Sequence, residues 1–551
     1  MGGYSNRCPK LPWMIDFHSS DEGKVLNSQY AAAFANSFRS YQASLNVKSK
    51  ASNSRLTAVV CTFGSSINNE GTLQEMMDLG MTMIRLKMCH LSIETAEEAL
   101  RTIRNANDSY SKKIGCLYPL PVALDIKGSE IRTGFLKDST KQQITISQGE
   151  ILHLTSNQEY EEHVTPAMIY VDYESIDQIL EPHDTVYLNN GKIRLSVIEI
   201  EHKGVKCLVE STGELSSRSN VYLPGIPIKT RELTEKDIEE IRFGIDNKID
   251  VLFIPNIRSK DPIIKLRDLL GEEGKTIQII PKIDSFQALN RIDDIIEVAD
   301  GILINRSALA VDMPMEKLFL AQKSIIAKCN KVGKPVICSS EILNSMITSG
   351  SRPTKSEICD ISNAILDGVD SFLLSQETAN GPDPLEALSI LNNICKEAEN
   401  AVYQKQVFQE LLDHSLPPLE PLYALIVSAV QASLKCKAAA IIMTTTTGRC
   451  AKTVSMYRPR CPIIAVTRLS HAARLMHIYR GIEPLLYVNP VHKCWKNDIE
   501  NRIQFGITWG KVTGIIRGGD ALITLFSSQP GAGFVNTLRV IYASEYDTIS
   551  S

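Results

Sequence analysis

Short runs of β-branched and other apolar residues alternate with amphipathic segments along most of this chain, and this alternation restricts the possible folds more than any other feature. Segments with Leu or Ile at three- and four-residue spacing, which are typical of helices packed on a sheet, separate most of the runs. About eight strand–helix units close a (β/α)8 barrel, so we predict an α/β protein built on a TIM barrel. The predicted strands are residues 57–63, 82–86, 122–126, 250–254, 277–283, 301–304, 335–338 and 370–374.

Two parts of the chain depart from this rhythm. Residues 134–223 read as short strands joined by polar turns, which predicts an inserted β domain with strands at 143–146, 151–154, 185–188, 193–198 and 205–209. Beyond a helical region at 402–434, a separate C-terminal α/β domain is predicted, with strands at 438–443, 462–466, 485–488, 521–525 and 537–542. We therefore expect an N-terminal extension at 1–54, partly helical around 28–40, the barrel at 55–133 and 225–400, the inserted domain at 134–224, and the C-terminal domain at 401–551.

Composition excludes several classes of partner. The 59 Lys and Arg residues nearly balance the 63 Asp and Glu residues, so there is no general attraction to nucleic acid or to an anionic membrane. Thirteen cysteines include no CxxC pair, which argues against a disulfide framework and a structural zinc site. No stretch approaches the roughly 18 apolar residues of a membrane helix. We expect a soluble, cytoplasmic protein whose function depends on local sites.

Polar and charged residues follow most of the predicted barrel strands. Active sites of such barrels lie at the carboxyl ends of the strands, so these residues are candidates for one shared pocket. Arginine and lysine there suit a phosphate or carboxylate anion, and neighbouring carboxylates suit Mg²⁺. The alternative is a network of salt bridges around the rim. The residues at these ends are Arg85, Lys87, Asp125, Lys127, Glu130, Arg132, Lys282, Asp284, Asn305, Arg306, Ser339, Ser340, Glu341, Gln376, Glu377 and Thr378.

From about Arg55 to Val540 the sequence resembles pyruvate kinase. The motifs that carry the resemblance stand in the family's order: PVALDIKGSEIRTG at 121–134, IIPKID at 279–284, EKLFLAQK at 316–323, GKPVIC at 333–338 and MYRPRCPIIAVTR at 456–468. The resemblance implies a glycolytic phosphotransferase that converts phosphoenolpyruvate and ADP to pyruvate and ATP. It also implies that the inserted domain is a β-barrel lid and that the C-terminal domain serves effector binding and assembly into a homotetramer or mixed tetramer.

Carried over residue by residue, the resemblance gives each candidate a role. Arg85 and Lys282 match catalytic residues that hold the substrate phosphate and stabilise its charge during transfer. Arg306 matches a substrate-binding arginine, and Ser340 stands in place of a threonine that relays a proton to the enolate. The nucleotide-binding positions are Thr62, Arg132 and Arg218.

Two departures concern cations. Ala308 occupies the position of a metal-binding aspartate, and Asp284 replaces a glutamate, which predicts weakened binding of Mg²⁺ or Mn²⁺ with Asp284 as the retained ligand. The alternative is that Glu341, which replaces a glutamine of the family nearby, donates a second carboxylate. The family's K⁺ ligands are also changed, since Lys87, Cys89 and Ile126 replace oxygen-bearing residues and only Asp125 remains. We expect the Lys87 ammonium to pair with Asp125 and to replace K⁺; the alternative is drift at an unused site.

The effector pocket of the family is better matched. A hydroxyl-rich loop with Thr445, Thr447 and Arg449 suits one phosphate of fructose 1,6-bisphosphate, Trp495 and Arg502 match contacts to the other, and Gly531 and Gly533 match a covering loop. Three hypotheses remain open: an active pyruvate kinase with altered metal binding, a weak or inactive regulatory paralogue that binds anions and assembles with an active one, and a lyase of a related pyruvate-handling barrel.

Overall fold

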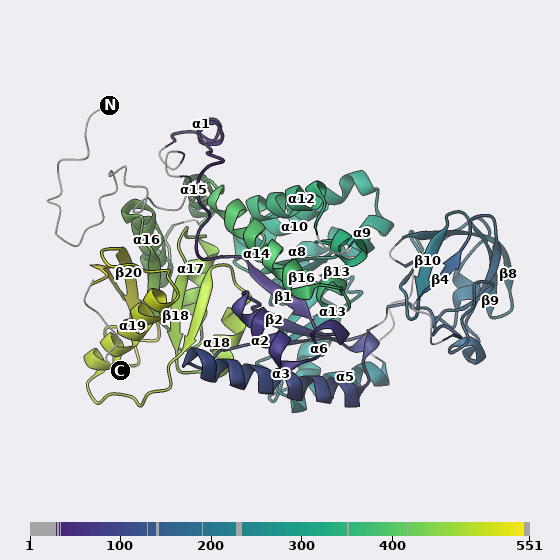
Figure 1. The fold of residues 1–551 in the computed structure, drawn as a ribbon, viewed down its shortest axis with the longest axis horizontal. Helices are drawn as coiled ribbons and strands as arrows, with labels where there is room; N and C mark the ends of the chain where they lie inside the picture. Colours follow the sequence, from purple (N-terminus) through teal and green to yellow (C-terminus); the bar gives the residue numbers. More distant parts are fainter. Residues whose placement is uncertain are drawn as a thin grey trace.

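The computed structural model describes residues 29, 32 and 35–544, except for 129, 139–142, 190, 227–233, 350, 351 and 416. Its centre is a closed barrel of eight parallel strands in the order β1-β16-β15-β14-β13-β12-β3-β2 (Figure 1). This confirms the predicted TIM barrel. The strands are β1 (Ala58–Thr62), β2 (Met83–Lys87), β3 (Val122–Asp125), β12 (Val251–Ile254), β13 (Gln278–Ile283), β14 (Ile302–Asn305), β15 (Val336–Ser339) and β16 (Ser371–Leu374).

The barrel strands are apolar on both faces because both faces are covered. Along β12, Leu252 and Ile254 belong to the core between the strands and the surrounding helices, whereas Val251 and Phe253 belong to the core inside the barrel. This period of two is the ordinary alternation of side chains along a strand. The core inside the barrel is continuous with buried residues of the C-terminal domain, among them Tyr479.

Amphipathic helices surround the barrel, and side-chain caps fix where several of them begin. Ser92, Thr234 and Thr354 each open a helix with a reciprocal capping box. The barrel helices and short turns are η2 (Ser65–Ile67), α2 (Glu70–Asp78), η3 (Met88–His90), α3 (Ile93–Ile114), α5 (Glu235–Asp246), α6 (Asp261–Leu270), α7 (Phe286–Asn290), α8 (Ile292–Val298), α9 (Arg306–Asp312), η5 (Met315–Lys317), α10 (Leu318–Val332), α11 (Ser345–Ser349), α12 (Lys355–Asp367), α13 (Gln376–Ala379) and α14 (Pro384–Asn400).

A separate sheet domain is inserted after β3. Its described strands form a six-stranded sheet in the order β11-β7-β8-β9-β5-β6 and a two-stranded sheet of β10 and β4 around their own apolar core. Three of these strands, β6, β10 and β11, were not predicted. The elements are β4 (Gln143–Ile146), β5 (Ile151–Thr155), η4 (Gln158–Tyr160), β6 (Met168–Tyr170), α4 (Ile176–Ile179), β7 (Thr185–Leu188), β8 (Ile193–Glu201), β9 (Gly204–Val209), β10 (Gly213–Ser216) and β11 (Val221–Tyr222).

The C-terminal domain is a five-stranded sheet in the order β19-β18-β17-β20-β21, parallel except for β21. Its third strand in the chain begins three residues earlier than predicted, at Ile482, and it includes Pro484; the edge position of this strand tolerates a proline. The elements are α15 (Gln404–His414), α16 (Pro421–Cys436), β17 (Ala440–Thr444), α17 (Arg449–Met456), β18 (Ile463–Thr467), α18 (Ser470–Met476), β19 (Ile482–Leu486), α19 (Trp495–Val512), β20 (Ala521–Phe526) and β21 (Thr537–Tyr542).

Little of the N-terminal extension is described. Of the helix expected around 28–40, residues 28, 30, 31, 33 and 34 lie outside the described residues, and the helix that is present, α1 (Phe38–Ala43), begins near the end of that range. Tyr41 anchors it by stacking on Tyr403, with ring centroids 4.5 Å apart. Among the described residues, no helix is long and apolar enough to cross a lipid bilayer.

Figure 1 shows the C-terminal domain, the barrel and the inserted domain in a row along the longest axis of the molecule. A cavity of about 400 Å³ lies between the barrel mouth and residues 220–226, which return the chain from the inserted domain. Four residues at or just after the carboxyl ends of barrel strands line this cavity, as expected for a TIM barrel: Glu130, Asn256, Asp284 and Asn305.

Candidate active site

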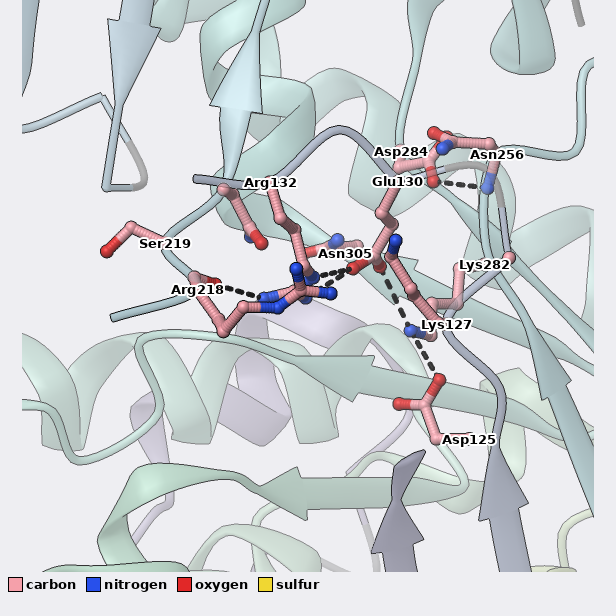
Figure 2. Close-up of polar contacts among 12 residues, drawn as sticks. Asp125, Lys127, Glu130, Arg132, Arg218, Ser219, Asn256, Lys282, Asp284 and Asn305 are labelled. Atoms are coloured by element: carbon pink, nitrogen blue, oxygen red, sulfur yellow. Dashed lines mark hydrogen bonds and ion pairs between the residues drawn. The ribbon is translucent and has the colours of Figure 1, made fainter. Parts of the chain in front are cut away.

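A buried network of opposite charges lies at the carboxyl ends of β2, β3 and β13. Asp125, which is 1% exposed, contacts Arg85 through Nε at 2.8 Å and Lys282 Nζ at 2.6 Å. Lys282 Nζ also lies 3.4 Å from Glu130 Oε1, and Arg132 forms an ion pair with the same carboxylate (Figure 2). Burial would raise the pKa of Asp125, but Arg85 and Lys282 outweigh it and lower the value. Asp125 is therefore ionised at neutral pH.

The cations of this network can exchange a carboxylate partner for a bound oxyanion. Glu130 lines the cavity and contacts Lys282, so it connects the cavity with the buried network. Arg85 and Lys282 share the Asp125 carboxylate, and an oxyanion can take the place of this carboxylate as the partner of either cation. The predicted anion pocket and the alternative rim network are thus the same set of residues.

Thr62 and Arg85 are tied together. Thr62 Oγ1 donates to the Leu374 carbonyl at 2.8 Å and accepts from Arg85 Nη1 at 3.2 Å. Thr62 is buried, and its hydroxyl oxygen holds the Arg85 guanidinium in place.

Arg306 lies at the start of α9 and organises the loop after β15. Its Nη2 donates to the carbonyls of Ser340 and Glu341, both at 2.8 Å, and it forms an ion pair with Asp360. Ser340 and Glu341 both have positive φ angles, 72° and 54°, a conformation that non-glycine residues rarely adopt. Ser340 Oγ donates to Asn305 Oδ1 at 2.9 Å. Arg306 thus holds a strained loop that presents the Ser340 hydroxyl.

The two predicted nucleotide-side arginines are neighbours between barrel and inserted domain. Arg132 Nη1 donates to the backbone carbonyl of Arg218 at 2.7 Å. The Arg218 guanidinium lies over the Phe135 ring, 5.6 Å from its centroid, and 3.9 Å from Asp172.

The metal-binding position offers one carboxylate. Asp284 Oδ2 accepts from the Asn256 backbone N–H at 2.7 Å (Figure 2). Its buried Oδ1 has no hydrogen-bond partner among the residues that the structure describes. Burial raises the pKa of Asp284 to about 7. Ala308 lines the same cavity and supplies no ligand. Among the described residues, no cluster of three or more His, Cys, Asp or Glu could hold a metal. The donor set fits Mg²⁺ only where substrate and water complete its coordination, a usual arrangement for this ion.

The predicted ion pair between Lys87 and Asp125 does not form, because Arg85 and Lys282 already occupy both oxygens of Asp125. Lys87 instead places its charge near Glu130, whose pKa stays low against the effect of burial because Lys282, Arg132 and Lys87 surround it. Burial in turn lowers the pKa of Lys87.

The predicted effector residues lie after β17, on α19 and in the loop between β20 and β21. Thr445 Oγ1 accepts from the Gly448 N–H at 3.1 Å in the turn before α17, and Arg449 is exposed there. Arg502 lies over the Trp495 ring, 5.7 Å from the ring centroid, and 3.3 Å from Asp498. The remaining members of this set are the exposed Thr447 and the positive-φ glycines Gly531 and Gly533.

Sequence reasoning missed two residues of the barrel mouth. Asn256 follows the barrel strand β12, whose carboxyl end was not among the strand ends considered in the sequence. The rule that active sites lie at these ends would have found it. Asp172 comes from the inserted domain, where it accepts from Lys127 Nζ at 2.6 Å and from the Arg132 N–H at 2.7 Å. No pattern in the sequence indicates that contact.

Comparison with known proteins gives a consistent result. The family model described as pyruvate kinase, barrel domain, matches residues 54–388, and the one described as pyruvate kinase, alpha/beta domain, matches residues 423–541. Pyruvate kinase PKLR of Rattus norvegicus is 39% identical over 516 residues, which cover 94% of this chain and 90% of the relative. The pyruvate kinase of Candida albicans is 36% identical over 490 residues (89% and 96%), and pyruvate kinase 1 of Saccharomyces cerevisiae is 35% identical over 498 residues (90% and 98%).

Proposed function

Because this chain belongs to the pyruvate kinase family, we propose that it transfers the phosphoryl group of phosphoenolpyruvate to ADP, which yields pyruvate and ATP. The observation that carries the proposal is the buried meeting of Arg85 and Lys282 at Asp125, beside a cavity large enough for a small phosphorylated substrate. Fixed cations of this kind stabilise the negative charge of a phosphoryl group in transfer.

We assign the remaining roles as follows. Arg85 and Lys282 bind the substrate phosphate, and Thr62 acts through Arg85. Arg306 acts chiefly as a positioning residue that aims the Ser340 hydroxyl, and Ser340 delivers a proton to the enolate. Arg132 and Arg218, at the junction with the inserted domain, serve the nucleotide phosphates. The inserted domain then acts as a lid over the cavity.

The pyruvate kinase family generally uses Mg²⁺ and K⁺. In this chain Asp284 would hold the divalent cation, which supplies neutralisation of charge on the transferring phosphoryl oxygens. We propose that Mg²⁺ or Mn²⁺ binds more weakly than in a site with two carboxylates, because Ala308 adds no ligand.

We further propose that catalysis does not require K⁺. The Lys87 ammonium lies close enough to Glu130 to help lower the pKa of that carboxyl group, and the side chain of Ile126 offers no oxygen to a hard cation.

A second function is favoured by Ala308 together with the effector residues of the C-terminal domain: a weakly active, regulatory subunit that binds fructose 1,6-bisphosphate and assembles into a tetramer with itself or an active relative. The turn that contains Thr445 and Arg449, and the Arg502 guanidinium over the Trp495 ring, support this alternative.

Pyruvate formation from phosphoenolpyruvate and ADP distinguishes the two. Wild type should turn over with Mg²⁺ or Mn²⁺, and Lys282→Met should lose at least about 100-fold in kcat, the usual loss for a group that stabilises transition-state charge. Absence of turnover in wild type, with turnover in Ala308→Asp, would favour the regulatory subunit. Equal rates for wild type and Lys282→Met would refute the proposed site.

A further inference from the structure

A second cavity, separate from the barrel mouth, lies where the barrel meets the C-terminal domain. Its volume is about 220 Å³; since water in the liquid takes about 30 Å³ per molecule, it holds several waters or one small ligand. α10 and the end of α12 line its barrel side, α15 forms another wall, and Arg458 and Arg480 come from the C-terminal domain. These three helices are labelled in Figure 1.

Gln404, the first residue of α15, lines this cavity and is 5% exposed. Neither its amide oxygen nor its amide nitrogen has a hydrogen-bond partner within the described part of the chain. Buried amide groups in proteins are nearly always hydrogen-bonded, because an unpaired one keeps its full desolvation penalty. The side chain therefore has one acceptor and two donors available to an occupant of the cavity.

Two buried arginines line the same cavity, and only one of them is neutralised. Arg458 forms a bidentate pair with Asp370, through Nη1 at 2.6 Å and Nη2 at 3.1 Å. Arg480 is 4% exposed, and its guanidinium makes no ion pair or hydrogen bond with any residue that the structure describes. A buried charge without a partner is unfavourable, so this cation requires a counter-charge.

The acidic residues near Arg480 are committed elsewhere. Burial lowers the pKa of Arg480 to about 10, with Glu399 as the main opposing influence, so the guanidinium stays charged at neutral pH. Glu399 itself accepts from the N–H groups of Leu56 and Thr57, both at 2.7 Å. Of the acidic residues at the cavity wall, Asp367 pairs with Lys323, and the exposed Glu410 accepts from Gln406 at 2.7 Å.

We propose that this cavity binds a small oxyanion, a carboxylate or phosphate group, between the Arg480 guanidinium and the Gln404 amide. Arginine binds such groups through two parallel hydrogen bonds, and the amide nitrogen donates a third. The Gln404 amide oxygen then accepts from a hydroxyl or ammonium group on the same ligand. Val407 and Leu411 give its carbon atoms an apolar wall. The ligand contacts both domains and stabilises their junction.

The test is binding of inorganic phosphate, acetate and glycolate to the full chain, by calorimetry and thermal unfolding. Arg480→Met removes the charge and keeps much of the volume; Gln404→Leu removes the amide. Arg449→Met is the matched control, because it removes an exposed arginine from the effector loop and leaves this cavity intact. One class of sites should persist in Arg449→Met and weaken at least about tenfold in Arg480→Met, the size expected for hydrogen bonds to a charged group.

The three probes also show which kind of ligand supplies the oxyanion. Binding of phosphate alone assigns a phosphate ligand, whereas tighter binding of glycolate than of acetate assigns a hydroxycarboxylate and a role for the Gln404 oxygen. Crystals of wild type soaked in each probe should show the anion against Arg480. Identical isotherms for wild type and Arg480→Met, or only water in the soaked cavity, would overturn the proposal. If Arg480→Met does not fold, Gln404→Leu and the soaked crystals decide.

Discussion

Replacing Ala308 by Asp tests whether the barrel mouth lacks a second carboxylate for its divalent cation. Ala308 is 1% exposed on α9 and lines the cavity that Asp284 also lines. A second carboxylate there, without a cation, would raise the pKa values of both acids, because like charges oppose ionisation in a buried site. A divalent cation removes that repulsion and gains a ligand. The variant should therefore depend on Mg²⁺ more strongly than wild type.

The magnitude follows from the ligand count. Changes to residues that only support a metal ligand alter affinity about 10–100-fold, so a direct ligand should add at least about tenfold, or ~1.4 kcal/mol. Because the free energy of unfolding rises as RT ln(1 + [L]/Kd), Mg²⁺ well above Kd should stabilise Ala308→Asp by about 1.4 kcal/mol more than wild type. The assay is thermal unfolding against MgCl2 at constant ionic strength, with pyruvate formation measured over the same range.

Ala310→Asp is the matched control. Ala310 lies on the same helix but does not line the cavity, so its Mg²⁺ titration should coincide with that of wild type. If Ala308→Asp also coincides with wild type, the metal ligands lie elsewhere and the reasoning from the missing carboxylate is wrong.

Three further predictions concern other parts of the molecule. Arg306→Leu should lower kcat about 100-fold with a smaller change in KM, because the Ser340 loop loses its carbonyl anchors and small displacements of reacting groups cost about that much; equal effects on kcat and KM in steady-state kinetics would show that Arg306 binds substrate directly. The turnover rate should stay within about twofold when KCl is replaced by tetramethylammonium chloride at fixed ionic strength, since the Lys87 ammonium already supplies a cation; a steep rise with KCl would contradict this. Glu240 is 1% exposed, and burial raises its pKa from 4.5 to about 7, so unfolding releases its proton between those values and stability falls as pH rises through that window. Glu240→Gln, which keeps an acceptor for the Lys127 N–H, should gain up to about 3 kcal/mol relative to wild type between pH 4.5 and 7 in urea unfolding, and parallel pH curves would show that Glu240 titrates normally.

The barrel could be predicted from sequence because its strands are buried on both faces. Runs such as 251–254 are continuously apolar and bounded by polar segments, a pattern that surface strands do not produce. The start of β19 was less predictable, because Pro484 argues against a strand unless the strand lies at an edge, and edge position is a property of the whole sheet.

At the barrel mouth, the sequence indicated which charged residues gather but not how they pair. Lys87 and Asp125 lie opposite each other on neighbouring strands, which made their ion pair a reasonable prediction. Arg85 and Lys282 pair with Asp125 instead of Lys87, because both side chains reach its carboxylate. Lys282 comes from a strand 157 positions further along the chain. Such competition among long-range partners is set by the closed barrel and not by local spacing.

The apolar filling of the barrel and one side of the C-terminal sheet belong to a single buried cluster, which joins residues such as Phe253 and Ile280 to Val454 and Tyr479. The barrel and the C-terminal domain therefore share this part of their hydrophobic core. A truncation that ends near residue 400 would open the underside of the barrel to water and should yield an aggregating product instead of a minimal enzyme. By the same geometry, a shift of the C-terminal sheet presses directly on the side chains beneath the catalytic strands.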